Sequence, residues 1–289
     1  MKILNLLLIV CVVTVSSCAS DADDTTPAEP QLIIKLKFDP TQARLNNLGQ
    51  PSTIPAGNAA QSPTIRRMSA NYIEVAPSPT TLLGQGEIIF TGPETTSGGN
   101  NAINFQSATF AGNDEVFLSI PLSEVSNGNY DWVRVSLAYQ EGDITFKAAN
   151  GNDYSGTLAS FVGYNTYITS FNLNGSSFNV NANRPQGFWA FEALGFASQD
   201  QAPEGATTVP NPLFNSSPIP QGSCVVTGPF ANGLTLTGNE TQDVVVTLSF
   251  SINNSFEWTE VNFDGKYEPT AGEQVVDMGL RGLIPIVEN

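Results

Sequence analysis

The sequence predicts an all-β protein with a β-sandwich-like body and long Pro-rich loops. Short runs of alternating apolar and polar residues recur along the chain and are rich in Val, Ile, Phe and Tyr. Clusters of Gly and Asn separate these runs, as expected for turns that need a positive φ. No long stretch carries the period of an amphipathic helix, so a sandwich is favoured over a mixed fold.

The predicted strands begin with residues 32–38, where apolar and polar residues alternate. Residues 130–137 alternate strictly and contain strong β formers, and residues 244–252 are the longest β-rich run. The other predicted strands are residues 116–122, 167–173, 178–181 and 187–191. Predicted turns lie at residues 98–100, 127–129, 150–152 and 174–175.

Two proline-rich segments, residues 39–66 and 198–222, are predicted to be long loops that wrap over a sheet edge. Residues 109–120 and 235–250 share a second pattern, in which a Gly-Asn turn and an acid lead into an alternating strand. A duplicated hairpin would give the body, residues 31–289, two β lobes. Chance similarity between two hairpins is the alternative.

The first 17 residues have the pattern of a cleaved signal peptide. Lys2 is followed by an apolar run from residue 3 to residue 15, which is shorter than the roughly 20 residues needed to cross a bilayer. Ser16 and Ser17 then precede Cys18, and residues 19–30 contain no large apolar side chain. Residues 18–30 are therefore predicted to be a flexible tether.

Two small residues ahead of Cys18 resemble the lipobox of bacterial lipoproteins. The resemblance implies that Cys18 is acylated, with a lipid such as palmitate, and becomes the first residue of the mature chain. The acidic run Asp21, Asp23 and Asp24 resembles the surface-export signal of Bacteroidota lipoproteins, which implies the outer face of the outer membrane. The alternatives are a periplasm-facing lipoprotein and an ordinary secreted protein cleaved near Ala19.

The composition excludes several classes of function. A net charge of −16 argues against nucleic acid as a partner, because phosphate binding needs clustered Lys and Arg. The chain has no His, which removes imidazole metal sites and Ser-His-Asp catalysis. Cys11 lies in the predicted signal peptide, so Cys224 has no disulfide partner in the mature body and is predicted to be a buried strand residue.

Residues 260–277 contain a candidate calcium loop. Calcium loops place oxygen ligands at alternate positions, then a Gly for the turn, a backbone carbonyl and a late acid. The segment resembles the Asp-Gly-x-Tyr calcium loops of secreted bacterial β-proteins, but it begins with Glu and its late acid comes two positions further on. The alternative is a plain hairpin turn at Asp264-Gly265. The predicted ligands are Glu260, Asn262, Asp264, the Lys266 carbonyl, Glu273 and Asp277.

Trp189 and Trp258 are candidate ligand-binding residues, because each lies near an acid and other aromatic residues and could stack on a sugar ring. Core aromatic residues at strand positions are the alternative. Carboxylate-based glycoside hydrolysis is a second possibility, since Asp and Glu are plentiful, although no pair of acids has a recognisable setting.

Residues 187–191 and 244–252 resemble metal-handling proteins of the MbnP type, which use sandwich-like lobes; the lack of His speaks against a copper role. The sequence as a whole favours a non-catalytic binding module on the cell surface, for a glycan or a protein partner, with calcium as a candidate stabilising ion. The alternatives are a carboxylate-based glycan hydrolase and a structural subunit of a surface assembly.

Overall fold

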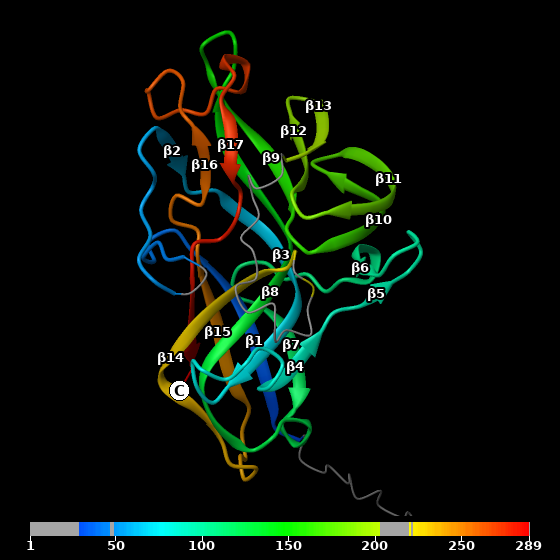
Figure 1. Cartoon of the computed structure of the whole chain (residues 1–289), viewed down its shortest axis with the longest axis vertical. Helices are drawn as coiled ribbons and strands as arrows, with labels where there is room; N and C mark the ends of the chain where they lie inside the picture. Colours follow the sequence, from blue (N-terminus) through cyan, green and yellow to red (C-terminus); the bar gives the residue numbers. More distant parts are fainter. Residues whose placement is uncertain (1–28, 47–48, 203–219, 221, 289) are drawn as a thin grey trace, which may run out of the picture.

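A computed structural model describes residues 29–46, 49–202, 220 and 222–288, which form an almost entirely β structure (Figure 1). The predicted all-β, sandwich-like fold is confirmed. Helical structure within these residues is confined to the short turns η1 (Phe105–Ser107), η2 (Leu122–Glu124) and η4 (Pro269–Ala271). No helix in this part of the chain is long and apolar enough to cross a membrane.

The strands group into several sheets, and two of them meet as a sandwich. In chain order the strands are β1 (Gln31–Asp39), β2 (Asn58–Gln61), β3 (Thr64–Ala76), β4 (Glu87–Thr91), β5 (Glu94–Thr95), β6 (Ala102–Asn104), β7 (Glu115–Pro121), β8 (Gly128–Lys147), β9 (Asp153–Phe161), β10 (Asn165–Leu173), β11 (Ser176–Pro185), β12 (Phe188–Ala193), β13 (Phe196–Gln201), β14 (Cys224–Leu236), β15 (Val244–Ser251), β16 (Phe256–Thr259), β17 (Gln274–Asp277) and β18 (Leu283–Val287).

Strand β8 is 20 residues long and changes one of its pairing partners along its length. On one side it pairs with β3; on the other its first half pairs with β14 and its second half with β9. The change of partner falls between Leu137, opposite Cys224, and Tyr139, opposite Phe161. The sequence predicted only residues 130–137 of this strand, because Glu141, Gly142 and Asp143 interrupt the apolar pattern further on.

The sheet β18-β15-β1-β7 packs against the first half of β8 and its neighbours, and we call this part the N-proximal sandwich. Strand β1 lies parallel to β15 and antiparallel to β7. Its side chains alternate between a buried inner face and a half-exposed outer face, as the sequence predicted. The two segments of the predicted repeat end in β7 and β15, which flank β1 in the same sheet. The inner face of β1 consists of Leu32, Ile34, Leu36 and Phe38.

A buried ion pair joins the neighbouring strands β3 and β8, where Glu74 lies directly opposite Arg134. Glu74 and Arg134 are fully buried, and the closest oxygen–nitrogen distance is 3.7 Å. The Glu74 carboxylate also accepts hydrogen bonds from the Tyr72 hydroxyl and from the backbone N–H groups of Gly84 and Gly86. A Cβ on Gly86 would lie 2.5 Å from that carboxylate, so glycine is needed for this close approach.

The second half of β8, together with β9, β12, β13 and the small sheet β17-β16-β2, forms what we call the distal region. In Figure 1 it lies at the top, whereas β1 begins near the bottom. The sheet β11-β10-β6-β5 packs beside it over an aromatic core. That core includes Phe105, Tyr139, Phe161, Phe171, Phe178 and Phe188.

The structure corrects the two predicted loops. Residues 58–61 form β2 and residues 64–66 begin β3, so the loop prediction for residues 39–66 was wrong there. Residues 198–201 belong to β13, so that loop starts later than predicted, and residues 203–219 and 221 lie outside the described part of the chain. Cys224 is buried in β14 with a free thiol, as predicted, and burial raises the pKa of that thiol to about 12.

Candidate functional site

The distal region contains a cavity of about 670 Å³ between two β layers. One wall is a face of β8, β9, β12 and β13, and the other comes from β16, β17 and the segment of residues 267–273 that leads into β17. Most of the wall is apolar. The apolar lining residues are Ile144, Leu158, Trp189, Phe191, Ala202, Phe256, Tyr267, Pro269, Val275, Val276 and Met278.

The alternation of β12 divides its side chains between the cavity and the core. Phe188 is buried in the aromatic core, whereas Trp189 and Phe191 are partly exposed and line the cavity. The Phe191 ring lies against Gly156 of β9, where a Cβ would come within 2.2 Å of the ring. Glycine at residue 156 therefore makes room for this part of the wall.

The polar part of the wall comes mainly from β13 and β17. Asp200 lies directly opposite Trp189 in the β12–β13 pairing, and Ser198 lies opposite Phe191. Because directly paired residues project from the same side of a sheet, these four side chains share the cavity face. The polar lining residues are Ser198, Asp200, Gln201, Glu273 and Gln274.

The two candidate ligand-binding tryptophans have different environments. Trp189 lines the cavity. Trp258 is fully buried, and its ring centroid lies 5.7 Å from that of Phe256 and 5.6 Å from that of Tyr267. Trp258 therefore supports two rings that line the cavity and is not itself among the lining residues.

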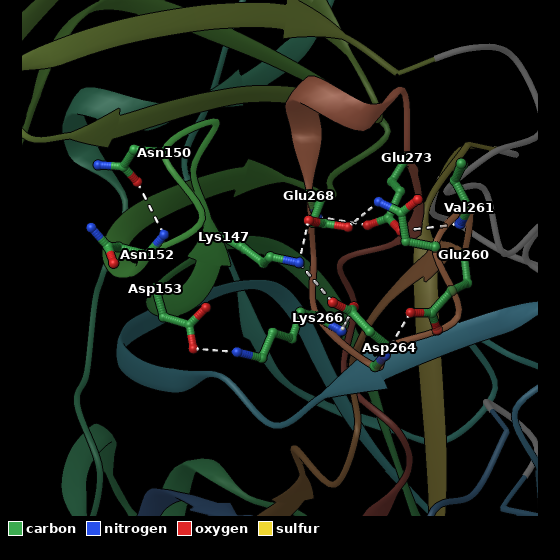
Figure 2. Close-up of polar contacts among 12 residues, drawn as sticks. Lys147, Asn150, Asn152, Asp153, Glu260, Val261, Asp264, Lys266, Glu268 and Glu273 are labelled. Atoms are coloured by element: carbon green, nitrogen blue, oxygen red, sulfur yellow. Dashed lines mark hydrogen bonds and ion pairs between the residues drawn. The ribbon is translucent and has the colours of Figure 1, made fainter.

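The candidate calcium loop contributes Tyr267, Pro269 and Glu273 to the lining of the cavity. Two of its acids, Glu260 and Glu273, are bonded to backbone groups of the loop itself (Figure 2). Glu260 accepts a hydrogen bond of 2.7 Å from the Gly265 N–H. Glu273 accepts one from the Val261 N–H at 3.0 Å and one from the Glu268 N–H at 2.6 Å. Each of these carboxylates closes a turn of the loop, which fixes the position of Tyr267 beside the cavity.

An ammonium group from β8 joins the two halves of this loop. Figure 2 shows Lys147 reaching toward both Asp264 and Glu268, at Nζ–oxygen distances of 2.8 and 2.7 Å. Bonding to Lys147 holds the pKa of Asp264 below its ordinary value. The pKa of Glu268 is also lowered, because Asn262 and Lys147 both donate hydrogen bonds to its carboxylate. Lys266 makes a further ion pair with Asp153, at the start of β9.

The predicted metal ligands do not converge on one point. Asn262 donates to Glu268, and Asp277 lies apart, in β17, where it pairs with Arg281 at 2.6 Å. Burial raises the pKa of Asp277. Within the described residues, no group of three or more acidic, Cys or His side chains is arranged to hold a metal ion.

The sequence reasoning missed Phe191, Phe256, Tyr267 and Met278, which form much of the apolar wall. The signal for Phe191 was available, because it lies two residues after Trp189 in a predicted strand and so shares its face. For Lys147 there was no such signal, because its partners lie more than a hundred residues away in the chain.

No protein-family model matches the chain, and no curated protein or solved structure is significantly similar to it.

Proposed function

We propose that the chain is an outer-membrane lipoprotein, anchored at the cell surface through acylated Cys18, that binds a small molecule in the distal cavity without transforming it. The cavity carries this proposal. Its volume of about 670 Å³ falls within the range of small-molecule sites, roughly 300–1,000 Å³. Its mostly apolar wall and few polar groups are also typical of such sites.

The arrangement of the chain supports the proposed anchoring. Strand β1 begins at Gln31, directly after the predicted tether, at the end of the molecule opposite the distal region (Figure 1). A lipid on Cys18 would therefore attach the body at the end farther from the cavity.

The cavity offers less support for the alternative of a glycan hydrolase. Its two acidic lining residues are Asp200 and Glu273. Both carboxylate oxygens of Glu273 already accept backbone hydrogen bonds, so this group has a structural task. Glycoside hydrolysis uses two carboxyl groups, one as acid and one as base or nucleophile.

The alternative of a structural subunit in a surface assembly rests on a different feature, the exposed aromatic residues of the distal region. Phe196 is 82% exposed and Phe263 is 77% exposed. Single exposed apolar side chains are common on proteins, so they favour a partner protein less strongly than the cavity favours a small ligand.

Calcium remains a proposed structural ion for residues 260–273. In this loop a bound calcium ion would have to replace Lys147 between Asp264 and Glu268, because the ammonium group already forms an ion pair with each of these acids. The ion would then tie the loop to its surroundings in place of Lys147, and the role would be structural.

The binding function is tested by titrating purified protein with the neutral probe naphthylmethanol in an isothermal calorimeter. We expect Trp189→Ala to weaken binding by about tenfold, since base- or ring-stacking on an aromatic side chain contributes roughly 1–3 kcal/mol. Trp132→Ala is the matched control, because Trp132 lies in the half of β8 that belongs to the N-proximal sandwich. Absence of binding to the unaltered protein, or equal loss in both variants, would contradict the proposal.

The proposed anchor is tested separately. Cys18→Ser should release the protein from the membrane fraction.

A further inference from the structure

The geometry points to an organic cation that carries a flat ring as the ligand of the distal cavity, with the ring against Trp189 and Phe191 and the positive charge toward Asp200. This inference rests on the proposed function, and it specifies the chemical class of the ligand. Three features of the cavity wall carry it.

The first feature is the shape of the apolar wall. Trp189 and Phe191 come from neighbouring positions on one face of β12, and Phe256 and Tyr267 stand on the opposite layer. The Phe256 and Tyr267 rings lie edge to face, with centroids 5.1 Å apart. Aromatic side chains on both sides of a cavity favour a flat ring between them, because rings pair in stacked and edge-to-face geometries.

The second feature is the sign of the charge. The charged residues among the described lining are Asp200 and Glu273, and both are acidic. Two basic groups beside the loop, Lys147 of β8 and Lys266 of the loop itself, are held in ion pairs with Asp264, Glu268 and Asp153. An anionic ligand would enter this wall without a positive partner, which is costly for a desolvated charge.

The third feature is the position of Asp200 beside Trp189. These residues are directly paired across β12 and β13, so the carboxylate stands next to the indole ring on the cavity face. Asp200 is exposed, and its carboxylate accepts a hydrogen bond from the backbone N–H of Gln201. A carboxylate next to an aromatic face attracts a cation twice, through its charge and through the quadrupole of the ring. The net charge of −16 adds a long-range attraction for the same kind of ligand.

The test compares three probes that share one ring system and differ in charge: naphthylmethylammonium, naphthylmethanol and naphthoate. We expect the cation to bind about tenfold more tightly than the neutral alcohol, and naphthoate to bind more weakly than either. Asp200→Asn, which keeps the shape of the side chain, should reduce the preference for the cation to about twofold and leave the alcohol unchanged. Asp131→Asn is the matched control, because it removes the same charge from the first half of β8.

The outcomes separate this inference from the proposed function. Equal binding of all three probes, or a preference for naphthoate, would overturn the inference while the cavity kept its role as a binding site. A preference for the cation that Asp131→Asn lowers as much as Asp200→Asn would also overturn it, since the overall charge would then be the cause. Failure of every probe to bind would contradict the proposed function itself.

Discussion

The N-proximal sandwich and the distal region share β8 but use it in different ways. In the N-proximal sandwich the inward side chains of β8, Val133, Val135 and Leu137, are almost fully buried against the opposite sheet. In the distal region Ile144 of β8 and Leu158 of β9 line a cavity instead. The same continuous sheet therefore closes a core at one end and borders a cavity at the other.

Strand length explains much of this difference. The outer sheet of the N-proximal sandwich contains β1, β15, β7 and β18, with nine, eight, seven and five residues. The small sheet of the distal region contains β2, β16 and β17, with four residues each. Four residues span only about 13 Å, so this sheet covers less of the face opposite. Loop residues complete the wall, and ion pairs hold the loop.

The largest expected effect comes from replacing a Leu by Ala, once in the N-proximal sandwich and once in the distal region. Leu36→Ala, in the fully buried inner face of β1, should lower the free energy of unfolding by about 4 kcal/mol, because the packed core cannot fill the void. Leu158→Ala should cost about 1–2 kcal/mol, since this side chain already borders a cavity. Urea denaturation measures both values. Equal losses would mean that the distal region is packed as tightly as the sandwich.

A somewhat smaller loss is expected from Glu74→Gln in the N-proximal sandwich. The substitution leaves the buried guanidinium of Arg134 without its charged partner and weakens the bonds to Gly84 and Gly86, so we expect a loss of about 3 kcal/mol. Glu124→Gln is the control: Glu124 is exposed, and its replacement should change stability by less than about 0.5 kcal/mol. If the two variants were equally stable, the buried pair would not contribute to the sandwich.

The smallest effect is expected at the partly exposed ion pairs of the distal region, and it bears on calcium. Lys147→Met removes the ammonium group between Asp264 and Glu268. We expect millimolar calcium to raise the melting temperature of this variant more than that of the unaltered protein, because the competing cation is gone and an ion that binds the native state stabilises it. Scanning calorimetry with calcium and with a chelator measures the shift.

Asp264→Ala in the same background provides the control, because it removes one of the acids that the ion would contact. Its addition should abolish the calcium response. No response in any of the three proteins would contradict the calcium prediction and leave residues 260–273 as a turn held by Lys147 and by its own backbone.

Local pattern was sufficient to predict some elements and insufficient for others. Strand β1 could be predicted because it is buried on one face, so its sequence alternates with a period of two. Strand β3 was missed although it has 13 residues, because its last nine residues are all buried and include the polar Ser69, Asn71 and Glu74. A strand covered on both faces loses the alternating pattern, and polar residues inside it are understood only through partners such as Arg134.

The sequence by itself determined the β class, alternating strands such as β1, β7 and β15, and the burial of Cys224, because each depends on residue type and short-range period. It also singled out Trp189 as a candidate binding residue. The tertiary structure decided that Trp189 borders a cavity and which residues line the wall opposite it. It also brought Lys147 to Asp264 and Glu268, and Asp200 to Trp189. Such contacts depend on how strands are ordered and how sheets pack, and those arrangements join residues whose separation along the chain carries no signal of their proximity.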